Sequence, residues 1–452
     1  MDLAQRYTDV GVIGAAGKMG SGIALLLCQQ MTHRRLGPDG KGRRFKLTLM
    51  DVNDAALDGL QSYLASQLKR MAEKSTILLR GLYADRKDLV ENGEIIDAFV
   101  ADALALPRFT TDLGAMKGAH MVFEAIAENI DLKKKVYGEL KNLCGPETWF
   151  FTNTSSIPIS LLDREVGLGG RIVGYHFYNP PAVQKLLELI TGPDTQSDLI
   201  EASKQIASDL RKKVIPANDI AGFIGNGHFI RDGLYGISEL ERLTGEHGFP
   251  EAAYLVNHVS QDWLIRPMGI FQLIDYVGVD VFQCILGVMN RFIDGEDLHS
   301  TLIDALMDKG VRGGQNPDGS QKDGFFRYEK GRPVAVYSLD EGKYQPLDDS
   351  WTGKLDGLLG TLPEGYVPWK GLARDPGKNE KLAAYFANLR ATDTLGSSLA
   401  TSYLKRSKEI GENLIKSGVA ANAEDVNGVL LNGFFHLYGP INDYAADPQT
   451  VH

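Results

Sequence analysis

A histidine and a glutamate twelve residues apart are the pair in this sequence best suited to proton transfer. Glu188 lies between Leu187 and Leu189, in an apolar run typical of a buried strand or the start of a helix. A carboxylate buried there is costly unless it meets a partner, and His176 is the nearest candidate. An imidazole oriented by a carboxylate has a fixed tautomer and can accept a proton near neutral pH. We therefore predict a His176–Glu188 dyad that acts as a general base.

A polar cluster favours catalysis over a structural histidine. A single histidine beside an apolar run is more often a hydrogen-bonded core residue than a catalyst. Here, however, the sequence Asn-Thr-Ser-Ser at 153–156 directly follows the apolar residues 149–151. A strand at 149–151 would place these hydroxyls at its carboxyl end, where open α/β sheets bind their ligands.

A strand, a glycine-rich turn and an apolar helix follow one another near the N-terminus. Residues 10–13 are apolar and precede the turn, and an apolar helix begins near residue 23. Small residues in such a turn let the backbone approach a pyrophosphate at the helix N-terminus. The GxxGxxG spacing is one residue longer than the usual fingerprint, so the turn alone is a weak signal of dinucleotide binding. The candidate residues of the turn are Gly14, Gly17, Lys18, Met19 and Gly20.

An acidic residue at the end of the second predicted strand supports the same interpretation. Asp51 follows the strand at 45–50 and is placed to accept hydrogen bonds from the adenosine ribose hydroxyls. It lies further from the glycines than the usual distance because residues 32–44 look like an inserted basic loop. Neither Val52 nor Asn53 offers a positive charge to a 2′-phosphate, which favours NAD over NADP. Asp51 could also cap the helix that follows.

Alternating strands and helices then predict the fold class. Further strands at 108–111 and 121–123, and an amphipathic helix at 54–74, indicate an α/β domain of the Rossmann type with a doubly wound, parallel sheet. From residue 218 onward the pattern is helical, and we expect an all-α C-terminal region. Residues 432–444 resemble 267–276, which indicates two related helical modules. The expected domains are 1–217 (NAD binding), 218–338 (first helical domain) and 339–452 (linker and second helical module).

Composition and charge exclude several classes. The chain has 452 residues, 43% of them hydrophobic, and a net charge of −10 that argues against general nucleic-acid binding. We find neither a signal-peptide core nor an apolar run long enough to span a bilayer, so we expect a cytoplasmic protein without a membrane partner. Cys28, Cys144 and Cys284 lie far apart among apolar residues, which predicts reduced core thiols and no metal site.

With these features together, the sequence resembles the 3-hydroxyacyl-CoA dehydrogenase family along nearly its whole length. The resemblance implies NAD-dependent oxidation of an (S)-3-hydroxyacyl-CoA to the 3-oxoacyl-CoA, with an acyl-CoA as the small-molecule partner. The order and spacing of the matching segments make it more specific than the glycine turn. These segments are 153–156, 176–180, Glu188 and 222–226.

The resemblance also implies a role for each matching residue. His176 would remove the proton of the 3-hydroxyl, and Glu188 would hold the imidazole and stabilise its charged form. Ser155 would bind the 3-oxygen, and Asn226 would position substrate and histidine. Lys69 marks the region that would hold the CoA phosphates, together with Arg70 and Lys74, although a solvated helix end explains these cations equally well. The implied cofactor residues are Gly14, Gly17, Gly20, Asp51, Glu128, Lys133, Ser155 and Asn179.

Three alternatives remain open at this point. The enzyme could act on a non-CoA 3-hydroxy compound such as a sugar acid or carnitine, because such enzymes share the scaffold and dyad and the lysines at 69–74 form no clear CoA-binding pattern. A non-catalytic NAD-binding protein is the second alternative, although it would not need an oriented base. Apolar residues at 271–282 could form a homodimer face, or the second helical module could cover them within one chain.

Overall fold

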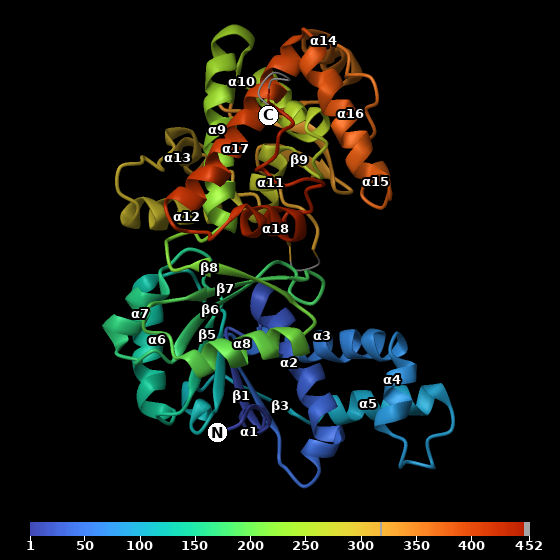
Figure 1. The fold of residues 1–452 in the computed structure, drawn as a ribbon, viewed down its shortest axis with the longest axis vertical. Helices are drawn as coiled ribbons and strands as arrows, with labels where there is room; N and C mark the ends of the chain where they lie inside the picture. Colours follow the sequence, from blue (N-terminus) through green and yellow to red (C-terminus); the bar gives the residue numbers. More distant parts are fainter. Residues whose placement is uncertain (317–318, 447–452) are drawn as a thin grey trace. The chain divides into compact units, whose positions relative to one another are not determined.

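The computed structural model describes residues 1–316 and 319–446. The chain divides into two compact units, with unit 1 at Met1–Asp219 and unit 2 beginning at Ile220 (Figure 1). The boundaries expected at 217/218 and 338/339 remain predictions.

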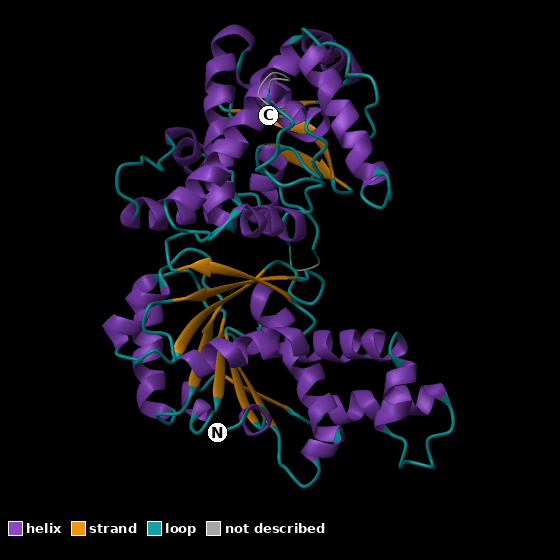
Figure 2. Cartoon of the chain, in the orientation of Figure 1, coloured by secondary structure: helices purple, strands orange, loops and turns teal. Residues whose placement is uncertain are grey.

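Unit 1 is built on an eight-stranded sheet with helices on its faces (Figure 2). The strand order is β3-β2-β1-β4-β5-β6-β7-β8, and the order reverses at β1, as in doubly wound Rossmann-type folds. This confirms the predicted fold class. The strands are β1 Asp9–Ile13, β2 Lys46–Met50, β3 Pro107–Thr110, β4 Met121–Glu124, β5 Trp149–Thr152, β6 Ile172–Phe177, β7 Leu186–Thr191 and β8 Lys213–Asn218.

Two strands, β7 and β8, depart from the parallel sheet that we expected. β7 runs antiparallel to β6, whereas β7 and β8 are parallel. Only residues 178–185 connect β6 to β7, and a parallel crossover needs a dozen or more residues. The short connection forces the reversal and places Glu188 directly opposite His176 in the register.

The helices of unit 1 correct two details of the sequence interpretation. α2 continues to Leu36, so the first part of the expected loop at 32–44 is helical. Asn53 caps α3 by accepting the N–H of Ala56, so Asp51 is not the cap. The helices are α1 Leu3–Arg6, α2 Lys18–Leu36, α3 Asp54–Glu73, α4 Thr76–Leu82, α5 Asn92–Leu104, α6 Ile130–Leu143, α7 Ile159–Val166 and α8 Ser197–Asp209.

Unit 2 is largely helical, as expected, but it is not all-α. A three-stranded antiparallel sheet lies within residues 326–346, across the boundary expected at 338/339. Gly331 and Gly342, both at positive φ, lie in the turns between its short strands. The strands are β9 Phe326–Glu329, β10 Arg332–Ser338 and β11 Lys343–Pro346. The helices are α9 Gly225–His247, α10 Phe249–His258, α11 Ile270–Val277, α12 Val279–Phe292, α13 Thr301–Asp308, α14 Asp349–Leu359, α15 Trp369–Leu372, α16 Lys378–Ala391, α17 Leu395–Lys416 and α18 Ala423–Gly433.

The same asparagine–glycine arrangement occurs twice in unit 2. Asn257 precedes Gly269 by the same interval as Asn427 precedes Gly439. In each copy the asparagine Oδ1 accepts a backbone N–H just after that glycine, at 3.2 Å in the first copy and 3.0 Å in the second. In each copy a Cβ on the glycine would collide with the asparagine side chain. This equivalence supports the two related modules inferred from the sequence.

The backbone before the repeated glycine is also the same in both copies. Ile265 and Phe435 each stand four residues before it, with φ of 50° and 56°. A branched or bulky residue rarely adopts this left-handed conformation, so its recurrence at matching positions is not accidental. Each copy also begins with a long helix, α9 in the first and α17 in the second.

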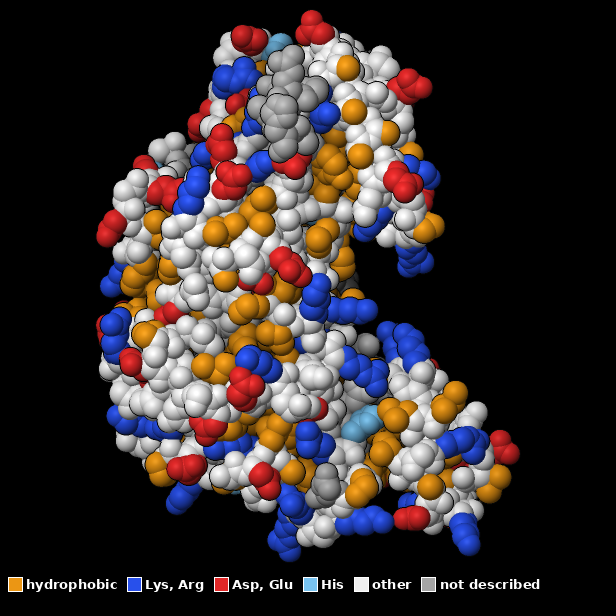
Figure 3. All heavy atoms as spheres, viewed as in Figure 1, with side chains coloured by type: hydrophobic (Ala, Val, Ile, Leu, Met, Phe, Trp, Pro, Cys, Tyr) orange, Lys and Arg blue, Asp and Glu red, His pale blue; other side chains and the backbone are white. Residues whose placement is uncertain are grey.

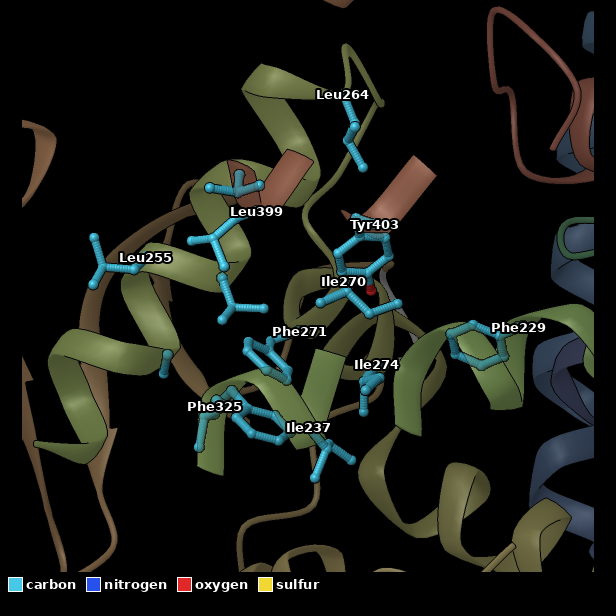
Figure 4. Close-up of a cluster of buried hydrophobic side chains, with 14 of the residues drawn as sticks. Phe229, Ile237, Leu255, Leu264, Ile270, Phe271, Ile274, Phe325, Leu399 and Tyr403 are labelled. Carbon is cyan, nitrogen blue, oxygen red and sulfur yellow. The ribbon is translucent and has the colours of Figure 1, made fainter. Parts of the chain in front are cut away.

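The core of unit 2 covers the apolar residues proposed for a dimer face. Phe271, Ile274 and Phe282 are each 0% exposed. They belong to one cluster with residues of the second copy such as Leu399 and Tyr403 (Figure 4). Phe271 stacks on Phe325 of the first module, with ring centroids 4.6 Å apart. The surface is therefore covered within the chain, and cover by the second module remains a prediction.

Other expectations concerned cysteines and membrane spans. Cys28 and Cys144 are buried, but Cys284 is exposed on α12, so the prediction of a core thiol was wrong there. Within residues 1–316 and 319–446, we find no single helix that is long and apolar enough to cross a bilayer. The α11–α12 pair meets these criteria only when taken together, across a bend of 90°.

Candidate active site

The predicted dyad is formed between β6 and β7. His176 Nδ1 lies 2.8 Å from Glu188 Oε2. The two residues are cross-strand neighbours in the antiparallel register, which brings their side chains together on one face of the sheet. Glu188 is 0% exposed and His176 8%. The carboxylate holds the proton on Nδ1, so Nε2 is the nitrogen that can accept a proton.

A second carboxylate holds the polar cluster that follows β5. Glu128 Oε1 accepts the backbone N–H groups of Ser155 and Ser156 at 2.9 and 3.0 Å and the Thr154 hydroxyl at 2.6 Å. Burial acts to raise the pKa of Glu128, but the charge of Lys133 and the hydroxyl hydrogen bonds outweigh it, and the pKa is lowered. Glu128 is therefore a fixed anion that orders the loop carrying Ser155.

Lys133 lies beneath this loop in a closed network. Its side chain is 1% exposed, and its ammonium lies 2.7 Å from Glu124 and 3.5 Å from Glu128. Burial acts to lower the pKa of Lys133, but the two carboxylates raise it. Tyr137 and Thr152 donate their hydroxyls to the other oxygen of Glu124. In this arrangement Lys133 supports Glu128 from within, and its predicted contact with the cofactor remains a prediction.

The ends of β5 and β6 are tied together. The Phe177 N–H donates to Asn153 Oδ1 at 2.8 Å, which links the strand of His176 to the 153–156 loop. Because β5 and β6 are parallel neighbours, Ser155 and His176 are delivered to the same edge of the sheet. Asn179 lies in the loop after β6. Asn226 lies in unit 2, in the first turn of α9, and its predicted role remains a prediction.

The glycine turn after β1 leaves room for a phosphate only because side chains are missing. Gly14 has a φ of +72°, and a Cβ there would lie 2.6 Å from the carbonyl oxygen of Ala125. A Cβ on Gly20 would collide with the carbonyl of Gly14. Gly17 caps α2, which begins at Lys18, so the N-terminal end of this helix lies at the turn. A helix N-terminus behind a glycine-rich turn suits a pyrophosphate.

Asp51 lies beside this turn. Its Oδ2 accepts the N–H of Ala16 at 3.0 Å, and its Oδ1 accepts the N–H of Asn53 at 3.2 Å. The neighbouring Val52 is 85% exposed and carries no charge. A half-buried carboxylate held at this position suits a ribose diol, so the residues present fit NAD.

The comparisons with known proteins agree with this geometry. Residues 9–220 match the family model "3-hydroxyacyl-CoA dehydrogenase, NAD binding domain". The domain at residues 9–220 therefore belongs to the 3-hydroxyacyl-CoA dehydrogenase family. The family resemblance seen in the sequence is thereby confirmed, as is NAD as the cofactor.

Curated relatives are similar over most of their own length. A probable 3-hydroxybutyryl-CoA dehydrogenase of Bacillus subtilis is 29% identical over 71% of this chain and 97% of its own. A probable 3-hydroxyacyl-CoA dehydrogenase of Caenorhabditis elegans is 28% identical over 72% of this chain and 94% of its own.

Solved structures share the fold. FadB2 of M. tuberculosis has a TM-score of 0.55 and 26% identity, and the match covers 72% of this chain and 99% of that one. The 3-hydroxybutyryl-CoA dehydrogenase of Escherichia coli matches 96% of this chain and 90% of its own, with a TM-score of 0.63 and 21% identity. At that identity, the second match shows the fold alone.

A basic pocket lies within the dehydrogenase domain. It has a volume of about 350 Å³, and its lining includes Lys74, Lys185, Arg211 and Lys212. Burial lowers the pKa of Lys212 to about 8. Figure 3 shows Lys and Arg side chains gathered over α2 and α3 on this face of unit 1. Lys69, which we singled out from the sequence, is exposed on α3 and does not line this pocket.

Sequence reasoning missed several residues of this region. Lys185, Arg211 and Lys212 come from loops far from α3 in sequence, and no local pattern joins them. Tyr178 was also missed, although its position two residues after His176 was visible.

Among the described residues, we find no group of three or more His, Cys, Asp or Glu side chains placed to hold a metal ion.

Proposed function

We propose that this protein oxidises (S)-3-hydroxyacyl-CoA thioesters to 3-oxoacyl-CoA, reversibly, with NAD. The observation that carries the proposal is the buried His176–Glu188 pair, at the sheet edge of a domain that belongs to the NAD-binding family of these dehydrogenases. The names of the similar proteins, probable 3-hydroxybutyryl-CoA and 3-hydroxyacyl-CoA dehydrogenases, support the same reaction.

Proton transfer is the part of the chemistry that this chain supplies. In the oxidative direction, Nε2 of His176 takes the proton of the 3-hydroxyl. Glu188 stabilises the imidazolium that forms, because its carboxylate lies 2.8 Å from Nδ1 in a buried site. The Ser155 hydroxyl hydrogen-bonds the 3-oxygen, and Glu128 keeps the Ser155 loop in place. Bound NAD supplies the acceptor for the C3 hydride.

The basic pocket is the second support for a CoA thioester. Four cations line it, and its carboxylate Asp209 is already paired with Arg34 at 2.6 Å. The pocket therefore suits the phosphates of a nucleotide better than a small uncharged handle. Lys74, at the end of α3, belongs to it, and we assign the CoA contact to Lys74 in preference to Lys69.

A direct assay tests the proposal. We would measure NADH oxidation with acetoacetyl-CoA, with acetoacetate lacking CoA, and with NADPH in place of NADH. Rapid turnover with the thioester and NADH alone is expected. Equal turnover with acetoacetate would favour the alternative of a non-CoA 3-hydroxy substrate. NADH binding without turnover on any 3-oxo compound would favour a non-catalytic protein.

Association and location remain predictions. Because Phe271, Ile274 and Phe282 are buried within the chain, we propose that this surface does not form a homodimer. Light scattering across a concentration series would show a constant monomer mass if this is right, and a rising mass would contradict it. The cytoplasmic location expected from the sequence also remains a prediction.

A further inference from the structure

A tyrosine hydroxyl contacts the carboxylate of the dyad. Tyr178, in the loop after β6, donates to Glu188 Oε2 at 2.8 Å. This is the same oxygen that His176 Nδ1 contacts, also at 2.8 Å. The rings of His176 and Tyr178 lie 4.9 Å apart at 40°, so the three side chains form one compact group. None of the roles proposed above includes Tyr178.

The proton of this hydrogen bond belongs to the tyrosine. Burial and the negative charge of Glu188 raise the pKa of Tyr178 well above its usual value. The hydroxyl therefore keeps its proton at any pH at which the protein would be assayed. Glu188 Oε2 therefore accepts from both His176 and Tyr178, and of these two donors His176 is the one whose charge changes during turnover.

We propose that Tyr178 is a positioning residue that sets how strongly Glu188 stabilises charged His176. A hydrogen bond to a carboxylate favours its ionised form. It also reduces the negative charge that the same oxygen offers to a second donor, here His176. Tyr178 thus keeps Glu188 ionised in a dry site and fixes its orientation. It also makes the imidazolium less stable, so that His176 releases its proton more readily. The effect on turnover rests on the proposed function, but the coupling between the three side chains does not.

The charged surroundings of the group are few among the described residues. His176 faces Glu188 from β6, and uncharged Ile215 faces it from β8. Lys213, two residues before Ile215 on β8, is exposed to solvent. At the same edge of the sheet, Glu128 is held by Lys133 and by the loop after β5. The Tyr178 hydroxyl, in direct contact with Glu188, is a group through which the charge of Glu188 can be adjusted by substitution.

Tyr178→Phe removes the hydroxyl and keeps the ring. The expected result is a shift of the acidic limb of the kcat/KM profile for 3-hydroxyacyl-CoA oxidation to higher pH, by about half to one pH unit. We expect plateau kcat to fall severalfold because Glu188 loses the hydrogen bond that fixes its orientation. KM for NAD should be unchanged. In the free enzyme, the NMR titration midpoint of the His176 ring should move in the same direction. The His176→Gln variant identifies this resonance by its loss.

The matched control is Tyr175→Phe. Tyr175 lies on the same strand as His176, and its buried hydroxyl donates to the carbonyl of Ser203 at 3.0 Å, away from the dyad. This variant loses one buried hydrogen bond and should lower the melting temperature without moving either pH measurement. Equal pH profiles for wild type and Tyr178→Phe, or equal shifts in both variants, would overturn the proposal.

Two further measurements keep the test decisive. In the Glu188→Gln background, Tyr178→Phe should produce no additional shift, because the carboxylate that transmits the effect is gone. If Tyr178→Phe does not fold, Tyr178→Met removes the hydroxyl in a second way and carries the same expectation. If the wild type shows no turnover but its His176 titration shifts in Tyr178→Phe, the proposed function fails and the positioning role stands.

Discussion

Both units of the molecule bury a carboxylate against a nitrogen base, but the two bases differ in chemistry. In unit 1, Glu188 contacts His176 at 2.8 Å. In unit 2, Asp232 contacts Arg266 at 2.7 Å, and the two residues are 4% and 5% exposed. A histidine gains and loses its proton near neutral pH, whereas a guanidinium remains charged. The first pair can transfer a proton, and the second can only hold structure together.

The surroundings of the Asp232–Arg266 pair agree with a structural role. Burial acts to lower the pKa of Arg266, but Asp232 and nearby tyrosines raise it, so the ion pair is permanent. Tyr403 donates its hydroxyl to the Asp232 carbonyl at 2.8 Å, and Arg266 donates to the Ser407 hydroxyl at 3.3 Å. Burial lowers the pKa of His228 to about 4, so this histidine is neutral at pH 7. The network joins α9 of the first copy to α17 of the second.

The largest expected effect breaks the pair in unit 1. His176→Gln should reduce kcat by about 10²- to 10⁴-fold, the usual contribution of a general base. NADH affinity, measured by fluorescence titration, should stay nearly unchanged because the glycine turn and Asp51 are distant in sequence and on other strands. Retained activity in this variant would make His176 a structural residue.

Breaking the pair in unit 2 should lower stability and leave the proton transfer unchanged. Arg266→Met leaves Asp232 as a buried, uncompensated charge and should cost about 3–5 kcal/mol of unfolding free energy. Urea denaturation measures this loss. The acidic limb of the pH–rate profile of the folded variant should not move. A shifted limb would show that the network in unit 2 takes part in the proton transfer.

The dependence of the unfolding free energy on pH tests a second buried carboxylate of unit 2, Asp275. Burial raises the pKa of Asp275 in α11 to about 7, despite hydrogen bonds from the Phe325 and Phe326 N–H groups and the Tyr328 hydroxyl. The native state then binds more protons than the unfolded chain between about pH 4 and 7. The unfolding free energy should therefore fall as pH rises through this window, by up to about 4 kcal/mol. In Asp275→Asn this slope should be absent, and an unchanged slope would assign it to other groups.

The smallest expected effect compares the two copies within unit 2. Asn257→Ala and Asn427→Ala each leave a buried backbone N–H unsatisfied after the repeated glycine, which costs about 1–3 kcal/mol. If the copies are equivalent, the two losses in thermal or urea unfolding should be similar. A loss in only one variant would show that the asparagine no longer has the same function in both copies.

Much of the site could be predicted because its signals are local. The glycine turn, Asp51 after the second strand and the polar residues 153–156 each lie next to the strand that positions them. Periodicity identified those strands, and the topology of a doubly wound sheet then placed their ends at one edge. The partnership of His176 and Glu188 followed from the cost of burying a carboxylate alone.

The remaining features depend on contacts between segments distant in sequence. Antiparallel pairing of β7 with β6 decided that His176 and Glu188 stand opposite each other, and this also placed Tyr178 on the same carboxylate oxygen. The burial of Lys133 against Glu124 depends on how α6 packs on the sheet.

In unit 2, the burial of Phe271 likewise depends on a distant segment, because its ring stacks on Phe325. The sequence by itself determined most elements of unit 1 and the reactive side chains, because spacing along one strand or helix sets which residues share a face. Only the tertiary structure decided which of these side chains are buried together, because the free energy of burial depends on every segment that surrounds them.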